Sequence, residues 1–208
     1  MAAKIVIIDY GMGNLWSVSS ALKFLKTEFL ISSNPQTIKK ADALILPGVG
    51  SFRRAMNSLQ ELGLDDAIAE SVKINQKNIL GICLGMQLLC NSSNEDGYTN
   101  GLGYIDGDVK NFDHNLVSSR KIPHIGFNSV DVPIKTKLYK NFKLHADFYF
   151  VHSYRLSCDN LSGSFAKCNY GEDFVASYEH ENIFASQFHP EKSQTNGLML
   201  LQNFLNTC

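Results

Sequence analysis

Short runs of apolar residues alternate with helical patterns over the first hundred residues of the chain. Residues 4–8 form a β-branched run, and between residues 15 and 25 the apolar positions recur at helical spacing. Further extended runs lie at residues 28–31, 43–46 and 79–82, and further helical stretches cover residues 51–75 and 86–90. Because these strands are apolar on both faces and alternate with helices, they predict a parallel sheet that is covered on both sides.

After about residue 100 the pattern changes to short extended runs, which predict hairpins and antiparallel strands. These runs lie at residues 104–110, 122–130, 147–155, 164–170, 173–178 and 183–188. The chain closes on an amphipathic helical pattern, and no repeat or linker separates the two parts. The sequence therefore predicts one α/β domain over residues 1–208, with a mostly parallel central sheet flanked by helices and a smaller antiparallel portion.

Composition and charge narrow the possible functions. The 208 residues are 44% apolar, and 19 Lys and Arg against 20 Asp and Glu give a net charge of −1, which disfavours a nucleic-acid binder. The longest apolar runs fall far short of the roughly 18 residues that span a bilayer, and the N-terminus lacks a signal-peptide pattern. We expect a cytoplasmic protein that binds neither nucleic acid nor a membrane.

The five cysteines form no C-x-x-C pair, and no histidine stands near them at the spacing of a zinc finger. No two histidines have the H-x-H or helical i, i+4 spacing of metal ligands. We expect neither a disulfide scaffold nor a metal site, and we expect no cofactor.

The turn Gly11-Met12-Gly13 follows a strand and opens a helix, as a dinucleotide-binding turn would. Trp16 occupies the place of the third glycine, and a bulky side chain there is expected to hold helix and strand apart. We therefore interpret the segment as a tight turn.

The segment 81–85, Gly-Ile-Cys-Leu-Gly, lies where an apolar strand meets a helix and has the G-x-C-x-G pattern of a nucleophile elbow. The flanking glycines leave room for the chain to fold back on itself. The helix N-terminus would favour the thiolate of Cys83, and the N–H of Leu84 would face a developing oxyanion. The alternative is a buried structural cysteine between two packing glycines.

A cysteine nucleophile needs a base, and the chain has six histidines. In an extended segment residues two apart face the same way, so Glu191 would reach the ring of His189 across Pro190. This carboxylate would fix the tautomer and aim the other ring nitrogen at the thiol. Alone, the segment also fits an exposed loop. His124 and His152 lack such a carboxylate and are expected to be structural or to support a neighbouring site.

Residues 81–89 (GICLGMQLL) and 188–193 (FHPEKS) together resemble the class I, or triad, glutamine amidotransferases, over nearly the whole chain. Four further segments are similar to one branch of that class, the glutaminase subunits of imidazole glycerol phosphate synthases. These segments are residues 9–14 (DYGMGN), 47–50 (PGVG), 123–128 (PHIGFN) and 149–154 (YFVHSY). The resemblance implies a flavodoxin-like fold and a glutaminase that passes ammonia to a (β/α)8-barrel cyclase subunit in histidine biosynthesis.

By the same resemblance, Cys83 is the nucleophile that attacks the side-chain amide of glutamine. His189 is the general base and then the general acid, and Glu191 orients it. Water activated by the imidazole then hydrolyses the glutamyl thioester.

The resemblance also implies an oxyanion hole made by the N–H of Leu84 and one N–H of the segment 47–50, at Val49 or Gly50. Two glycines let the peptides of this segment change orientation at a low cost in free energy. We therefore expect the hole to be incomplete until the partner docks with its own substrate bound. Gln87, one helical turn after the elbow, is a candidate substrate contact or a plain helix residue.

The implied heterodimer places Asn14 and Lys192 near the cyclase contact. Phe127 stands where the family segment usually has tryptophan; it keeps the aromatic face but loses the indole N–H, so docking could differ. Three other functions stay open. One is a paralogous amidotransferase that supplies ammonia to another barrel in surface-sugar biosynthesis, one is a free-standing cysteine hydrolase, and one is a non-catalytic regulatory subunit.

Overall fold

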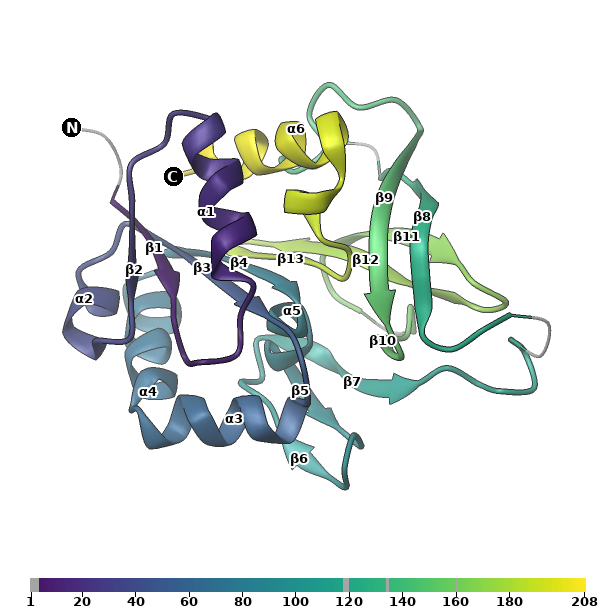
Figure 1. Cartoon of the computed structure of the whole chain (residues 1–208), viewed down its shortest axis with the longest axis horizontal. Helices are drawn as coiled ribbons and strands as arrows, with labels where there is room; N and C mark the ends of the chain where they lie inside the picture. The colour runs from purple at the N-terminus through teal and green to yellow at the C-terminus, as the bar shows by residue number, and fades with distance from the viewer. Residues whose placement is uncertain (1–3, 118–119, 134, 160) are drawn as a thin grey trace.

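The structure is a computed structural model that describes residues 4–117, 120–133, 135–159 and 161–208. One large sheet of nine strands crosses the molecule (Figure 1). Its spatial order is β2 (Phe29–Ser32), β1 (Ile5–Ile8), β3 (Ala43–Gly48), β4 (Asn78–Cys83), β13 (Ile183–Ser186), β12 (Asp173–His180), β11 (Ser164–Asn169), β8 (His124–Asp131) and β9 (His145–His152). The first five are paired in parallel and the rest antiparallel, which confirms the predicted mixed sheet.

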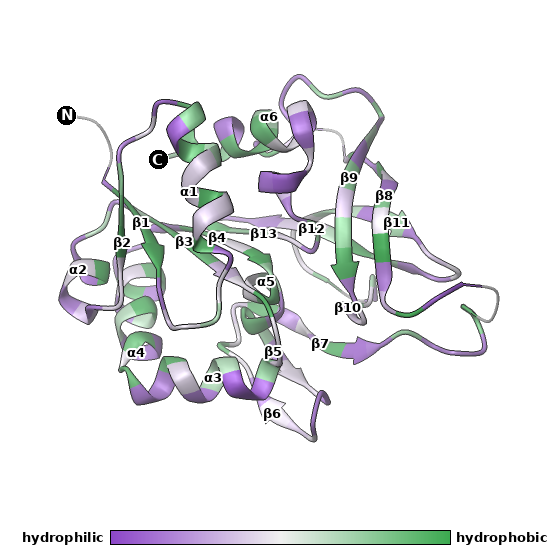
Figure 2. Cartoon of the chain, in the orientation of Figure 1, coloured by the Kyte–Doolittle hydropathy of each residue, from purple (hydrophilic) through white to green (hydrophobic). Residues whose placement is uncertain are grey.

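The parallel strands are apolar on both faces because helices cover both sides. Ile5 and Ile7 face one buried core, while Val6 and Ile8 face the other. Two helices, α1 (Leu15–Phe24) and α6 (Gln194–Leu205), lie on one side (Figure 1). The other side carries α3 (Phe52–Glu61), α4 (Leu64–Ala69) and α5 (Leu84–Leu88). Hydrophobic stretches accordingly run along the central strands and the inner sides of these helices (Figure 2).

The stretch over residues 51–75 is helical, as predicted, but it is divided. Gly63 adopts a left-handed backbone with φ of 63° and separates α3 from α4. A π-helical turn, Glu70–Ile74, completes the stretch. The sequence analysis also missed α2 (Pro35–Lys39), which begins at a proline after Asn34, whose side chain accepts the N–H of Gln36 at 2.8 Å.

A second sheet of four strands was not predicted as a separate unit. Its order is β10 (Tyr154–Leu156), β7 (Ile105–Asn111), β5 (Cys90–Ser93) and β6 (Thr99–Asn100). The predicted helix over residues 86–90 is wrong at both ends, because α5 starts at Leu84 and stops at Leu88. The carbonyls of Leu88 and Cys90 accept N–H groups of Leu102 and Gly103, so this segment pairs with a later stretch of chain.

The last short strand has the greatest consequence for the site. The sequence analysis placed residues 183–188 among antiparallel hairpins, but β13 also pairs in parallel with β4, with Ala185 opposite Gly81 and Ser186 opposite Ile82. The residues that follow β13 therefore leave the sheet at the same edge as those that follow β4. Within the described part of the chain, no helix is long and apolar enough to cross a membrane.

Candidate active site

Cys83 sits on a sharp turn between β4 and α5. Its backbone has φ of 54° and ψ of −110°, in a region that non-glycine residues rarely adopt. The two flanking glycines are needed for packing, because a Cβ on Gly85 would lie 1.7 Å from the carbonyl oxygen of Leu46, and one on Gly81 would lie 2.8 Å from Gly85. The strand, the turn and the glycines together present the thiol at the carboxyl edge of the sheet.

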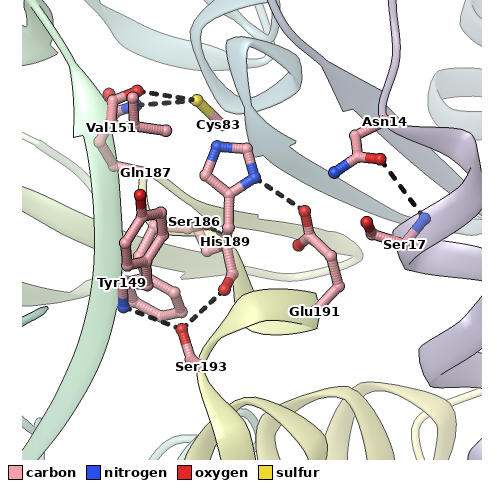
Figure 3. A network of polar contacts seen from close by, with 11 residues as sticks. Asn14, Ser17, Cys83, Tyr149, Val151, Ser186, Gln187, His189, Glu191 and Ser193 are labelled. Carbon is pink, nitrogen blue, oxygen red and sulfur yellow. Dashed lines mark hydrogen bonds and ion pairs between the residues drawn. The ribbon is translucent and has the colours of Figure 1, made fainter. Parts of the chain in front are cut away.

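His189 and Glu191 form a buried pair beside this turn. The Nδ1 atom of His189 lies 2.8 Å from the Oε1 atom of Glu191, and their side chains are 2% and 1% exposed. Figure 3 shows the second ring nitrogen of His189 on the side of Cys83. The contact with Glu191 was expected, but the reason was wrong: residues Pro190–Lys192 form a short 3-10 helix rather than an extended segment.

The pair is anchored by its surroundings. The N–H of His189 donates to the carbonyl of Tyr149 at 2.9 Å, and the hydroxyl of Ser193 donates to the carbonyl of His189 at 2.6 Å. Burial alone would lower the pKa of His189, but the hydrogen bond to Glu191 and the nearby Cys83 and Glu191 outweigh it, so this pKa is raised above its usual value. The surroundings of His189 therefore favour uptake of a second proton by the ring, which lies between a sulfur and a carboxylate.

The environment of the sulfur includes residues that the sequence analysis did not single out. The Sγ atom of Cys83 lies 3.8 Å from the carbonyl oxygen of Val151 and 3.8 Å from the Nε2 atom of Gln187 (Figure 3). The candidate Gln87 is buried and donates from Nε2 to Gln187 Oε1 and to the carbonyl of Tyr154, each at 3.0 Å. The sequence did hold signals for these residues, because each lies in or beside a segment that carries the family resemblance. Gln187 directly precedes the FHPEKS motif, and Val151 and Tyr154 lie in the YFVHSY segment.

A cavity of about 330 Å³ opens over the thiol. It is lined by Val49, Gly50, Cys83, Leu84, Gln87, Glu95, Pro123, Val151, His152, Ser153, Tyr154 and His189. Glu95, which was not predicted, is the acidic residue of this lining; its Oε2 accepts the N–H of Phe52 at 2.8 Å, and burial raises its pKa. The cavity thus joins a thiol, an imidazole and a half-buried carboxylate.

The candidate oxyanion donors all line this cavity, but their backbone N–H groups differ in hydrogen bonding and conformation. Leu84 is the first residue of α5, where an N–H has no partner within the helix. The N–H of Val49 donates to the carbonyl of Met12 at 3.0 Å, so in this conformation it is engaged within the chain. Gly50 adopts a φ of 103°, which only glycine takes easily.

The three residues expected at a partner contact are at the surface around the site. Asn14 caps α1 by accepting the N–H of Ser17 at 3.4 Å, and α1 packs against the short helix that carries Glu191 (Figure 3). Phe127 is 51% exposed on β8 and packs edge-on against Tyr149. Lys192 is exposed, with its amine 5.8 Å from the ring of Tyr149.

The turn after β1 is tight, with Gly11 at φ of 84° and its N–H bonded to the Asp9 carboxylate at 3.0 Å. The sequence analysis expected Trp16 to hold helix and strand apart, and this was wrong. The side chain of Trp16 points into solvent and is 78% exposed. The described residues also contain no group of three or more His, Cys, Asp or Glu side chains that could hold a metal ion.

The fold and the site define a class of protein in which a cysteine on a strand-to-helix elbow lies beside a buried histidine–glutamate pair. A model of the family "Glutamine amidotransferase class-I" matches residues 6–208. Solved structures with this fold include a glutamine amidotransferase (TM-score 0.73, 18% identity, 97% of each chain). The structure of PurLQS from Thermotoga maritima has a TM-score of 0.70 at 19% identity, and the match covers 100% of this chain and 99% of that one.

More similar relatives are named imidazole glycerol phosphate synthase subunit HisH. The HisH 1 protein of Campylobacter jejuni (strain RM1221) is 48% identical, covering 97% of this chain and 98% of the relative. HisH 1 of Parasynechococcus marenigrum is 44% identical over 98% of both chains, and HisH 2 of Vibrio vulnificus is 44% identical over 98% and 94%. The chain belongs to the class-I glutamine amidotransferases and, within them, to the HisH family.

Proposed function

We propose that this chain is the glutaminase subunit of an imidazole glycerol phosphate synthase. It hydrolyses glutamine to glutamate and ammonia, and the ammonia passes to a cyclase subunit that makes imidazole glycerol phosphate. The observation that carries the proposal is the elbow cysteine beside the buried His189–Glu191 pair at one cavity, in a chain 48% identical to a protein of that name.

In the proposed reaction the Sγ atom of Cys83 attacks the side-chain amide carbon of glutamine, and His189 takes the thiol proton. The tetrahedral intermediate collapses to a glutamyl thioester when His189 returns that proton to the departing ammonia. A water molecule then attacks the thioester carbonyl and gives a proton to His189. The second intermediate collapses to glutamate, and the sulfur recovers its proton from the ring.

Glu191 fixes His189 for both proton transfers. Its Oε1 atom accepts the proton on Nδ1 at 2.8 Å, so the Nε2 atom is left to face the sulfur. The same carboxylate stabilises the imidazolium that forms in each half of the reaction.

Both intermediates carry an oxyanion, and the hole for it is proposed to be incomplete in the free chain. Leu84 supplies one N–H, while the N–H of Val49 is held by Met12. Rotation of the peptide around Val49 and Gly50 would supply the second donor, and the positive φ of Gly50 makes such a rotation inexpensive. Docking of the loaded cyclase is the event proposed to drive it.

The cavity also offers contacts for the amino-acid end of glutamine. The carboxylate of Glu95 is the complement of the substrate ammonium group, and its partial burial strengthens that attraction. Gln87 uses both amide hydrogens inside the protein, so its contribution to the substrate is its position in the wall of the cavity.

The cyclase is proposed to dock on the surface around the mouth of this cavity, in a heterodimer that includes Asn14, Phe127 and Lys192. Phe127 and Ile125 are both more than half exposed on one face of β8, as expected of an apolar contact surface. Lys192 directly follows the proposed catalytic glutamate and adds a charge for an acidic group of the partner.

The test is the Cys83→Ala variant in the complex with the cyclase. Glutamine-dependent synthesis should be lost, while synthesis from added ammonium salt should continue at the wild-type rate, because ammonia bypasses the thioester. Cys208→Ala, at an exposed cysteine, is the matched control and should keep both activities. Loss of both activities in Cys83→Ala would mean that the cysteine is structural.

A further inference from the structure

Two buried histidines outside the proposed triad meet across the β8–β9 pair. His124 and His152 are opposite each other in the strand register, and both are almost wholly buried. The Nδ1 atom of His124 lies 3.1 Å from the Nε2 atom of His152. One ring must donate and the other must accept, so the contact needs a neutral ring on the accepting side.

The contact between Asn128 and the Nε2 atom of His124 determines which ring donates. The amide of Asn128 donates from Nδ2 to the carbonyl of Asn169 at 3.1 Å, and its Oδ1 accepts the N–H of Ser129 at 2.9 Å. These bonds fix the orientation of the amide, so its contact of 3.4 Å with the Nε2 atom of His124 is a donation to the ring. His124 therefore accepts at Nε2 and carries its proton on Nδ1.

The contact between His152 and the carbonyl of Tyr154 independently indicates that His124 is the donor and His152 the acceptor. The carbonyl oxygen of Tyr154 lies 2.8 Å from the Nδ1 atom of His152 and can only accept, so this ring also carries its proton on Nδ1. Its Nε2 atom is then free to accept from His124. Burial lowers the pKa of His124 to about 4 and that of His152 to about 3, so both rings are neutral at pH 7.

The Tyr154 carbonyl links the pair to the cavity. It also accepts the amide of Gln87 at 3.0 Å, so both of its lone pairs are used. The second hydrogen of that amide goes to Gln187, whose own amide lies 3.8 Å from the sulfur of Cys83. A chain of hydrogen bonds with defined directions thus connects β8 to the cavity wall and reaches the nucleophile.

Stacked aromatic rings hold His124 in place. Its ring lies 3.9 Å from that of Tyr170 and 4.8 Å from that of Phe150, centroid to centroid, with interplanar angles of 25° and 21°. The hydroxyl of Tyr170 in turn donates to the carbonyl of Lys121 at 2.8 Å. Packing therefore fixes the plane of the His124 ring, and the hydrogen bonds fix its proton.

We propose that His124 and His152 are positioning residues of the glutaminase site. They hold the Tyr154 carbonyl, and through it Gln87, in the orientation that the cavity needs to bind glutamine. Without a donor at His124, the buried Nε2 atom of His152 is unsatisfied, and a change of tautomer or rotamer at His152 releases Tyr154. The inference rests on the proposed glutaminase function, because it assigns a role within that site.

The first test compares two variants in the complex with the cyclase. His124→Leu removes the donor, so the KM for glutamine should rise about tenfold while kcat changes less than about twofold. His124→Asn places an amide nitrogen near the position of Nδ1 and should restore a KM close to wild type. His145→Leu, at an exposed histidine of β9, is the control, and ammonium-dependent synthesis should be unchanged in all three variants.

The second test needs no variant. Nitrogen-15 NMR of the imidazole groups in the wild-type chain at pH 7 should show the proton on Nδ1 in both rings. A proton on Nε2 of either ring, or a wild-type KM in His124→Leu, would overturn the proposal. Absence of glutamate release by the wild-type complex would instead refute the proposed function, whatever the tautomers are.

Discussion

After the Cys83 thiol, the proposed chemistry depends most on the carboxylate of Glu191, which fixes His189 for proton transfer. Glu191→Gln keeps the size of the side chain but removes its charge, so it stabilises neither the required tautomer nor the imidazolium. We expect kcat for glutamine hydrolysis to fall about 10²- to 10⁴-fold, with little change in KM.

Steady-state glutaminase kinetics in the presence of the loaded cyclase would measure this effect. Glu181→Gln, at an exposed turn position away from the site, is a matched control and should retain the wild-type kcat. A wild-type kcat in Glu191→Gln would contradict the role assigned to the pair.

The buried histidine pair also predicts how stability depends on pH. The folded-state pKa values of about 4 for His124 and about 3 for His152 lie below the usual value of about 6.5. Between about pH 6.5 and pH 4 the unfolded chain binds more protons than the folded chain, so stability is present above this window and is lost as the pH falls through it. Arg120, Arg155 and His189 face the pair and act in the same direction.

Urea unfolding between pH 7.5 and pH 5 would measure this loss. Each histidine contributes a slope of up to about 1.4 kcal/mol per pH unit inside the window. His124→Asn removes one titrating group, so its unfolding free energy should depend less steeply on pH than that of the wild type. Identical slopes for the two proteins would show that His124 is not held neutral by the fold.

The contact between α5 and β3 sets the shape of the elbow. A Cβ on Gly85 would overlap the carbonyl of Leu46, a backbone atom that cannot move aside without shifting β3. Gly85→Ala should therefore lower the free energy of unfolding by about 3 kcal/mol or more. In Gly13→Ala the added methyl group meets side-chain carbons at 3.3 Å, so this control should change stability far less. Equal unfolding midpoints in urea would contradict the tight packing of the elbow.

Elements with a strong local pattern were predictable, and those defined by distant pairing were not. The β-branched run that became β1 and the periodic helix α1 follow from their own residues. In contrast, β5 and β6 carry polar residues and exist because they pair with β7 and with each other. The end of α5 at Leu88 is set in the same way by later residues, which local periodicity does not reveal.

The site as a whole depends on a pairing that the sequence pattern did not reveal. The two local motifs were enough to select Cys83, His189 and Glu191, but β13 had to pair with β4 for them to meet. Glu95 reaches the cavity only through the tertiary fold, and no local signal marked it as functional. The place of Gln187 beside the sulfur of Cys83 also depends on the fold, although this residue directly precedes the FHPEKS motif. The single domain over residues 1–208 and the cytoplasmic location stay predictions.

The measurement that tests the account most directly is glutamate release from glutamine by the purified chain. Glutamate release should be measured for the chain alone and for the chain mixed with the cyclase barrel. The mixture should be measured without and with the ribonucleotide substrate of the cyclase, and the mixture that contains this substrate is the loaded one. Because the N–H of Val49 is held by Met12, the account predicts little release alone and strong activation only in the loaded mixture. Full activity without any partner would contradict it and indicate a free-standing hydrolase, and activation by a different barrel would indicate the surface-sugar paralogue.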